Sequence, residues 1–124
     1  MKGQKASLRL KKNWEFKRVY RKGRTVVSRN IVLYYCPNGK NINRIGFSIS
    51  KKVGKSVVRN KIKRIYREAF YKIEVNLHKG YDFILIARKP AVDVSFQEAC
   101  KELFDLCRKG KLLQKKALRQ QSDR

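Results

Sequence analysis

A segment of seventeen residues without an acidic side chain constrains the fold of this chain more than any other feature. It runs from Lys51 to Arg67, and a helical pattern begins in it at about Ser56. Eight of its residues are basic, namely Lys51, Lys52, Lys55, Arg59, Lys61, Lys63, Arg64 and Arg67. Repulsion among these cations disfavours an isolated helix, so a polyanionic partner is the natural explanation for keeping the charges together.

The composition of the whole chain supports the same expectation. The 33 Lys and Arg residues outnumber the 9 Asp and Glu residues, which leaves a formal net charge of +24 and a pI near 10.5. A field of this size attracts polyanions, and RNA is the partner that we expect. With 124 residues and 42% hydrophobic content, the chain is expected to fold as one domain around one core.

Neither a membrane-spanning helix nor a set of structural disulfides is expected. No apolar run approaches the roughly 20 residues of a spanning helix, and the N-terminal sequence lacks the apolar stretch of a signal peptide, so a cytoplasmic location is predicted. Cys36, Cys100 and Cys107 have no CxxC spacing and are odd in number, which indicates reduced cysteines in the core.

The first half of the chain predicts a helix followed by strands. Residues 12–21 form a helical pattern in which Phe16, Val19 and Tyr20 share an apolar stripe that excludes Trp14. Residues 26–36 are rich in β-branched and aromatic side chains and predict a strand with apolar groups on both faces in its second half.

A second strand is predicted over 44–50, after a PNGKNIN segment with the residues of a hairpin turn. One face of this strand is apolar, whereas the other carries Arg44, Gly46, Ser48 and Ser50, which cannot fill a core. A shallow groove on the sheet, open to an extended ligand, is one explanation. An antiparallel sheet with one solvated face is the other, and the sequence leaves both open.

A long helix is predicted from about Ser56 to Asn76. Its buried face is expected to contain Val58, Ile62, Ile65, Ala69 and Ile73. Arg59, Lys63 and Arg67 recur every fourth residue and, flanked by Asn60 and Arg64, predict a rigid cationic ridge opposite the core. We call Arg59, Lys63 and Arg67 the basic ridge.

The last third of the chain predicts a buried strand over 81–87, with the preceding strand as a parallel neighbour, and a third helix that begins with a capping box at Ser95–Glu98. Beyond Gly110 the chain is polar and basic, and either a short helix or a disordered tail is compatible with it.

Little in the sequence supports catalysis by the protein. His78 is the only histidine, and carboxylates that could hold catalytic metals are few. Gly54-Lys55-Ser56 lacks the earlier glycine of a phosphate-binding loop, since Ile49 occupies that position. Cys100 and Cys107 have no further ligands and are not a zinc site. We predict no catalytic residue, no metal site and no cofactor bound by the protein.

Aromatic residues give a second indication of RNA binding. Phe16 and Tyr20, one helical turn apart, together with Tyr34, could stack on unpaired bases while nearby Lys and Arg bind phosphates. Packing in the core is an equally good explanation for Phe16.

The stretch FSISKKVGKSVVRNKIKRIYREAF, from Phe47 to Phe70, resembles the signature of the protein subunit of bacterial ribonuclease P, which trims the 5′ leader from precursor tRNA. LRLKKNWEFKRVYRKG and DFILIARKPAVDVSF resemble the first helix and the last strand of that family. The resemblance covers about residues 8–108, the expected ordered core, and leaves a basic tail over about 110–124.

The resemblance implies an α+β fold, a single αβββαβα sandwich with a mixed sheet and a left-handed βαβ crossover. It also implies an accessory subunit of an endoribonuclease whose RNA subunit is the catalyst. Mg²⁺ would be required through that RNA, and one protein monomer would bind one RNA and the precursor tRNA.

Site residues follow from the resemblance position by position. The family's Arg-Asn-Arg core falls on Arg59, Asn60 and Lys61, and Lys61 departs from it because lysine lacks the bidentate guanidinium. The RNA-subunit surface would comprise Lys51, Lys52, Lys55, Arg59, Asn60, Lys61, Lys63, Arg64 and Arg67. The leader surface would comprise Phe16, Tyr20, Tyr34 and Ser48.

Two other classes of protein share some of these features. A ribosomal protein or RNA chaperone would have a similar size, pI and aromatic surface. A protein-only ribonuclease would cleave without an RNA cofactor, which a single histidine and few acids disfavour.

Overall fold

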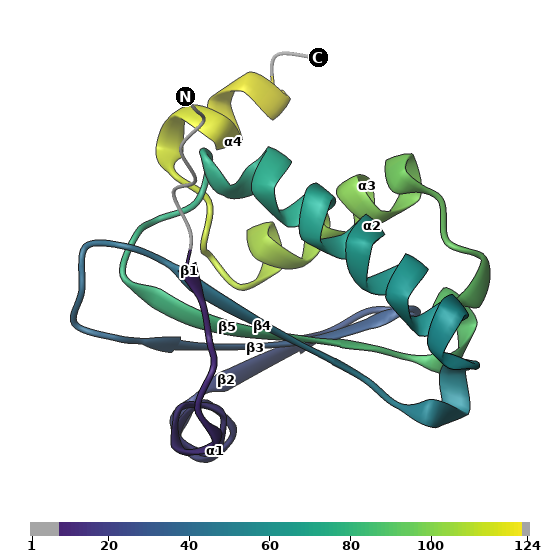
Figure 1. Cartoon of the computed structure of the whole chain (residues 1–124). Coiled ribbons are helices and arrows are strands. Elements are labelled where there is room, and N and C mark those ends of the chain that lie inside the picture. Colours follow the sequence, from purple (N-terminus) through teal and green to yellow (C-terminus); the bar gives the residue numbers. More distant parts are fainter. Residues whose placement is uncertain (1–7, 123–124) are drawn as a thin grey trace.

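One five-stranded mixed sheet organises the chain, with helices on both of its faces (Figure 1). The computed structural model describes residues 8–122. In chain order the elements are β1 (Leu8–Arg9), α1 (Asn13–Lys22), β2 (Arg24–Val27), β3 (Ile31–Pro37), β4 (Arg44–Ile49), the 3₁₀ turn η1 (Lys51–Val53), α2 (Ser56–Glu74), β5 (Tyr81–Ala87), the 3₁₀ turn η2 (Lys89–Asp93), α3 (Phe96–Lys109) and α4 (Lys115–Ser122). The α+β prediction with the order αβββαβα is confirmed, with β1 added before it and α4 after it.

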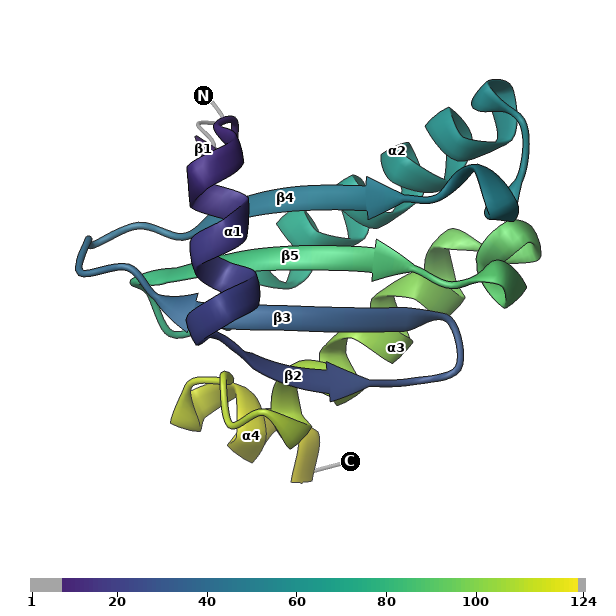
Figure 2. The ribbon, with the colours of Figure 1, turned by 90° about the horizontal axis from the view of Figure 1, so that it is seen from below.

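The strands lie in the order β1-β4-β5-β3-β2. β4 is parallel to both β1 and β5, whereas β3 is antiparallel to β5 and to β2. In Figure 2, with α1 in front of the sheet, the chain leaves β4, returns behind the sheet as α2 and enters β5. This path makes the crossover left-handed, against the strong general preference for right-handed connections.

The turn predicted over PNGKNIN forms, but the expected hairpin does not. Gly39 adopts a φ of 72°, as turn chemistry requires, yet β3 and β4 are separated by β5. β5 carries apolar side chains towards both faces and is almost wholly buried, so it is accommodated best in the centre of the sheet. The turn therefore joins two strands that are not paired.

The single strand predicted over 26–36 was also wrong, because a turn at Ser28–Asn30 divides it into β2 and β3. The Ser28 amide donates to the Ile31 carbonyl at 2.9 Å. Glu102 of α3 accepts hydrogen bonds from the Ser28 hydroxyl, from the Asn30 amide side chain at 2.8 Å and from the Asn30 backbone at 2.9 Å. The three polar residues inside the apolar run were the signal for this turn.

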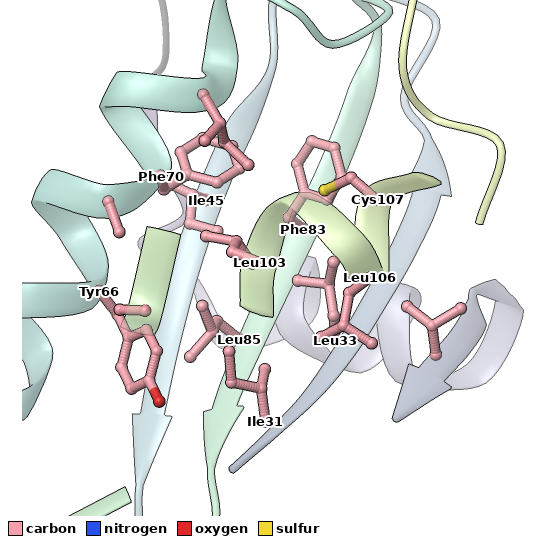
Figure 3. Close-up of a cluster of buried hydrophobic side chains, with 14 of the residues drawn as sticks. Ile31, Leu33, Ile45, Tyr66, Phe70, Phe83, Leu85, Leu103, Leu106 and Cys107 are labelled. Atoms are coloured by element: carbon pink, nitrogen blue, oxygen red, sulfur yellow. The ribbon is translucent and has the colours of Figure 1, made fainter. Parts of the chain in front are cut away.

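The main core lies between the sheet and the pair α2 and α3 (Figure 3). Ile45, Phe83, Leu85 and Leu33 project from the strands towards Tyr66 and Phe70 of α2 and towards Leu103, Leu106 and Cys107 of α3. The predicted capping box of α3 is confirmed, since Ser95 Oγ accepts from the Glu98 amide at 3.1 Å and Glu98 Oε1 accepts from the Ser95 amide at 2.9 Å. Both helices thus cover the sheet face opposite α1.

The basic segment after Gly110 is attached to this core. Leu112, Leu113 and Ala117 are buried, and Leu113 forms a β-bridge with Leu77. The alternative of a short helix is the one that the structure shows, as α4. Among residues 8–122, no helix has both the length and the apolar character needed to cross a membrane.

Tyr66 offers a test of the core. Its side chain is fully buried, and within the described residues its hydroxyl has no hydrogen-bond partner. Since an unpaired buried hydroxyl costs about 1–3 kcal/mol, Tyr66→Phe is expected to raise the free energy of unfolding by about 1 kcal/mol. Urea denaturation would measure this change, and a loss of stability in the variant would mean that the hydroxyl is hydrogen-bonded in solution.

Candidate nucleic-acid interface

The sheet face that carries α1 is built from three rows of side chains, each row running across the strands. Strand register aligns Cys36 with Asp82 and Arg44 in the first row, and Tyr34 with Ile84 and Gly46 in the second. The third row joins Val27, Val32, Ile86 and Ser48. Because side chains alternate along each strand, all three rows point to the same side.

α1 packs on the middle row and forms a second, smaller core there. Val19 is fully buried against Leu10, Cys36 and Ile84. Phe16 lies directly over Gly46, where an added Cβ would come within 2.5 Å of the ring. A side chain at 46 would therefore displace the Phe16 ring, and Phe16, which is half-buried, contributes to packing as well as to the surface.

The four residues predicted to bind the leader come together at this helix. Tyr20 and Tyr34 form an edge-to-face pair with ring centroids 4.9 Å apart, and Ser48 lies beside the Tyr20 hydroxyl. Partial burial raises the pKa of Tyr20, so its hydroxyl remains protonated at neutral pH. Tyr20 is still 39% exposed and presents its ring to solvent.

Beyond these tyrosines, no helix within residues 8–122 covers the third row. In Figure 2, α1 crosses the first halves of β4 and β5 and leaves their C-terminal halves open on this face. Val27 is 46% exposed there, and Val32, Ser48 and Ile86 are half-buried. We call these four residues the open sheet face. It lies on the face for which the sequence left open either a groove or a solvated sheet surface.

On the other side of α1, the first row forms a buried ionic network. Arg44 donates from Nε and Nη2 to the two Asp82 oxygens at 2.8 and 2.7 Å, and from Nη1 to Glu15 at 2.7 Å. Asn38 and Arg18 also donate to Asp82, at 2.9 and 3.3 Å. Because Asp82 is 0% exposed, these donors are what compensates its loss of water.

Glu15 joins this network to the first turn of α1. Its Oε1 atom accepts from the Lys11 and Lys12 amides, each at 3.0 Å. These backbone N–H groups, with a further contribution from Arg44, hold the pKa of Glu15 below its ordinary value. The network therefore sets the position of α1 on the sheet, and with it the position of Phe16 and Tyr20.

The acid-free segment from Lys51 to Arg67 begins where β4 ends. Ser50 Oγ accepts from the Lys52 amide at 2.9 Å and starts η1, and Gly54 allows the chain to approach Val58, which an added Cβ would meet at 2.8 Å. This bend places Lys51, Lys52 and Lys55 at the N-terminus of α2.

That N-terminus has the properties of an anion site. No side chain caps it, and its first turn has no acidic residue, so the amides at its start are not neutralised from within the described chain. Arg59 Nε donates to the Gly54 carbonyl at 3.1 Å, which holds the guanidinium beside this end of the helix. Backbone donors, the helix dipole and four cations together favour a phosphate group.

The basic ridge continues along α2, but its predicted place opposite the core was wrong. Arg59, Lys63 and Arg67 are half-buried, because the buried face of α2 also includes Tyr66 and Phe70. The ridge therefore borders the core. Asn60, Lys61 and Arg64 are exposed.

Sequence reasoning missed two cations beside this surface. Arg88 and Lys89 are exposed directly after β5, whose C-terminal end is parallel and adjacent to that of β4. Arg88 Nη1 donates to the Ser28 carbonyl at 2.9 Å, which holds it near the turn between β2 and β3. A basic pair directly after a buried parallel strand was the available signal.

Among the described residues, the cysteines, the histidine and the carboxylates are not gathered into a metal-binding cluster. Within residues 8–122 no three His, Cys, Asp or Glu side chains are placed to hold a metal ion, and His78 is exposed. Burial raises the pKa of Cys107 to about 12 and that of Cys100 above its ordinary value, so both thiols are protonated at neutral pH.

Comparison with known proteins agrees with this architecture. The family profile described as Ribonuclease P matches residues 5–111. The Ribonuclease P protein component of Caldanaerobacter subterraneus subsp. tengcongensis is 46% identical over 108 residues, which is 87% of this chain and 93% of that protein.

Solved structures show the same fold. The Staphylococcus aureus RNase P protein superposes with a TM-score of 0.78 at 39% identity, covering 86% of this chain and 97% of that one. The Thermotoga maritima RNase P protein superposes with a TM-score of 0.74 at 29% identity, covering 79% and 93%. The sequence profile, the curated relatives and the fold agree, and this chain belongs to the ribonuclease P protein family.

Proposed function

We propose that this protein is the accessory subunit of a ribonuclease P ribonucleoprotein that removes the 5′ leader from precursor tRNA in the cytoplasm. The basic ridge and the lysines of η1 bind the RNA subunit, and Tyr20, Tyr34 and the open sheet face bind the single-stranded leader. The RNA subunit, with its Mg²⁺, cleaves the phosphodiester bond. One protein monomer binds one RNA.

The observation that carries this proposal is the uncapped, acid-free start of α2, surrounded by Lys51, Lys52, Lys55 and Arg59. In a free protein such a helix start is unfavourable, because the cations repel one another and oppose the helix dipole. A folded RNA that places phosphates there turns both effects into binding energy. Family membership makes the RNA subunit of ribonuclease P the appropriate RNA.

The mechanism follows from charge and shape. Cations on the protein reduce the repulsion between RNA phosphates, so less Mg²⁺ is needed to bring ribozyme and substrate together. The leader exists only in the precursor, so contacts to it favour the precursor over the mature product. The open sheet face suits this task, because a flat surface with aromatic rims accepts unpaired bases with little sequence preference.

One reconstitution tests the proposal against its rivals. Purified protein and precursor tRNA are incubated at limiting Mg²⁺ with and without a bacterial ribonuclease P RNA. We expect leader removal only when both protein and RNA are present. Cleavage by the protein alone would indicate a protein-only nuclease, and an unstimulated ribozyme would indicate an RNA-binding protein of another kind.

Tyr20 provides a prediction for the leader surface. Tyr20→Ala is expected to weaken binding of precursor tRNA by at least about fivefold, because stacking contributes about 1–3 kcal/mol per base, and to leave mature tRNA binding unchanged. Fluorescence anisotropy of the two labelled tRNAs on the assembled complex measures both affinities. Tyr20 suits this test better than Phe16, since Phe16→Ala would also remove a packing contact.

Leu118→Ala is a matched control, since Leu118 is a comparably exposed side chain on α4. It should affect neither tRNA. An equal loss for precursor and mature tRNA in Tyr20→Ala would contradict a leader contact and leave Tyr20 as a surface packing residue.

A further inference from the structure

Trp14 is the most conspicuous side chain that the leader surface does not use. It is the only tryptophan of the chain and is 60% exposed on α1. Successive residues on a helix are about 100° apart, so Trp14 and Phe16, two residues apart, lie on nearly opposite sides of α1. Phe16 and Tyr20 face the open sheet face, and Trp14 and Arg18 therefore belong to the opposite flank of the helix.

A hollow of about 360 Å³ lies on that flank. Trp14, Arg18 and Lys40 line it, and Arg44 and Asp82 form its floor. This hollow is near the lower limit of volumes that hold small ligands, and it is large enough for a single base but too small for a duplex. We call it the Trp14 hollow.

The charge of the Trp14 hollow favours an anion. The carboxylates of Asp82 and Glu15 on its floor are already paired with Arg44 and Arg18. Arg18 is fixed by hydrogen bonds from Nη2 to the Pro37 carbonyl at 2.6 Å and from Nη1 to Asp82 at 3.3 Å, which leave further N–H donors on its guanidinium. The exposed Lys40 adds a second cation at the rim.

We propose that the Trp14 hollow binds one unpaired nucleotide of RNA, whose base stacks on the Trp14 indole and whose phosphate pairs with Arg18 and Lys40. An aromatic face beside fixed cations is the combination by which proteins hold unpaired bases without reading their sequence. The protein thus contacts single-stranded RNA on both flanks of α1. The nucleotide comes either from the ribozyme or from the precursor.

The single tryptophan reports directly on its own site. An octamer of oligouridylate added to the full chain is expected to quench Trp14 fluorescence saturably, both in the natural sequence and in Tyr20→Ala. In anisotropy measurements with the labelled octamer, Trp14→Ala should bind at least about fivefold more weakly, whereas Trp14→Phe retains most of the affinity because its ring still stacks.

Val75→Ala is the matched control, since Val75 is 68% exposed and follows α2, which lies on the sheet face opposite α1 (Figure 1). It should bind the octamer like the natural protein. An octamer that binds without quenching Trp14, or a Trp14→Ala variant that binds as well as Val75→Ala, would overturn the proposal.

The assembled complex identifies the source of the nucleotide. Quenching on addition of ribonuclease P RNA alone assigns it to the ribozyme, and quenching only on addition of precursor tRNA assigns it to the substrate. Quenching at neither step, with leader removal intact, refutes the Trp14 hollow and leaves the proposed function standing. If the complex assembled with the natural protein does not remove the leader, the proposed function is refuted independently of Trp14.

Discussion

Replacing Arg59, Lys63 and Arg67 together by alanine is expected to weaken binding of ribonuclease P RNA by at least about 100-fold. If each cation contributes only about 1 kcal/mol net through its phosphate contact, three contribute about 3 kcal/mol. These residues lie along one flank of α2 and are half-buried, and the Arg59 guanidinium is held by its hydrogen bond to the Gly54 carbonyl. Filter binding at limiting Mg²⁺ measures the affinity.

Salt dependence gives the same variant a second readout. A protein that neutralises six to ten phosphates loses about 10³- to 10⁵-fold in affinity between 50 and 200 mM salt, on the calibration for duplex DNA. Removing three contacts should reduce the slope of log affinity against log salt by about 2 to 3. The variant should therefore be weaker at low salt and also less sensitive to added salt.

A matched triple variant separates the ridge from the general field of the protein. Lys101, Lys115 and Lys116 are exposed on α3 and α4, and replacing them by alanine removes the same three charges from another part of the surface. This variant should retain most of the affinity. Equal losses in the two triple variants would show that binding depends on total charge and not on the ridge.

The place of this ridge shows what periodicity can and cannot predict. The repeat of Ile62, Ala69 and Ile73 located α2 and its buried side correctly. Tyr66 and Phe70 were missed because α2 packs against both the sheet and α3, so its buried face is wider than a stripe that meets one surface. Lys63, next to that wider face, is half-buried for the same reason.

Pairing between strands that are distant in the sequence was harder to predict. β5 was predicted as a buried strand with a parallel neighbour, and both features are confirmed. Its insertion between β3 and β4 was not predicted, because the turn residues before β4 are local and describe only the path of the chain. The left-handed crossover was expected from the family resemblance and not from any pattern in the residues.

The ionic network was invisible in the sequence for a related reason. Arg44 is 29 residues from Glu15 and 38 from Asp82, and no local pattern joins them. Arg44 was predicted on a face that could not fill a core, and Asp82 lies within a strand predicted to be buried over 81–87. Strand register brings Arg44 and Asp82 opposite each other, and α1 then covers the pair.

Arg44→Ala is expected to lower the free energy of unfolding by about 3–5 kcal/mol, because removing one partner leaves a buried charge without compensation. Asp82 would lose two of its donors, and Glu15 would lose its link to the sheet. α1 would then be held mainly by its small apolar core, so the preference for precursor tRNA should fall as well. Urea denaturation and the two tRNA affinities measure these effects.

Two further variants control this result. Arg24→Ala removes an exposed arginine from β2 and should change stability by less than about 0.5 kcal/mol. The double variant with Arg44→Ala and Asp82→Ala should be less destabilised than the sum of its parts, since no carboxylate is left unpaired. If Arg44→Ala is as stable as Arg24→Ala, the network does not hold α1.

The pH dependence of stability separates the two roles of Glu15, which pairs with Arg44 and also accepts from the Lys11 and Lys12 amides at the start of α1. Its pKa is lowered in the folded protein, so its contribution to stability is present above the ordinary value of 4.5 and is lost as the pH falls through the lower folded value. The backbone amides of Lys12 and Lys11 cause most of this lowering, and Arg44 causes less. In Arg44→Ala, acidification should therefore still cause most of the fall in the free energy of unfolding that Glu15 produces. In Glu15→Gln this fall should be absent. A variant that is less stable at neutral pH but keeps this dependence of stability on acidic pH has lost the attachment of α1 to the sheet. It has kept the cap that Glu15 provides at the start of the helix.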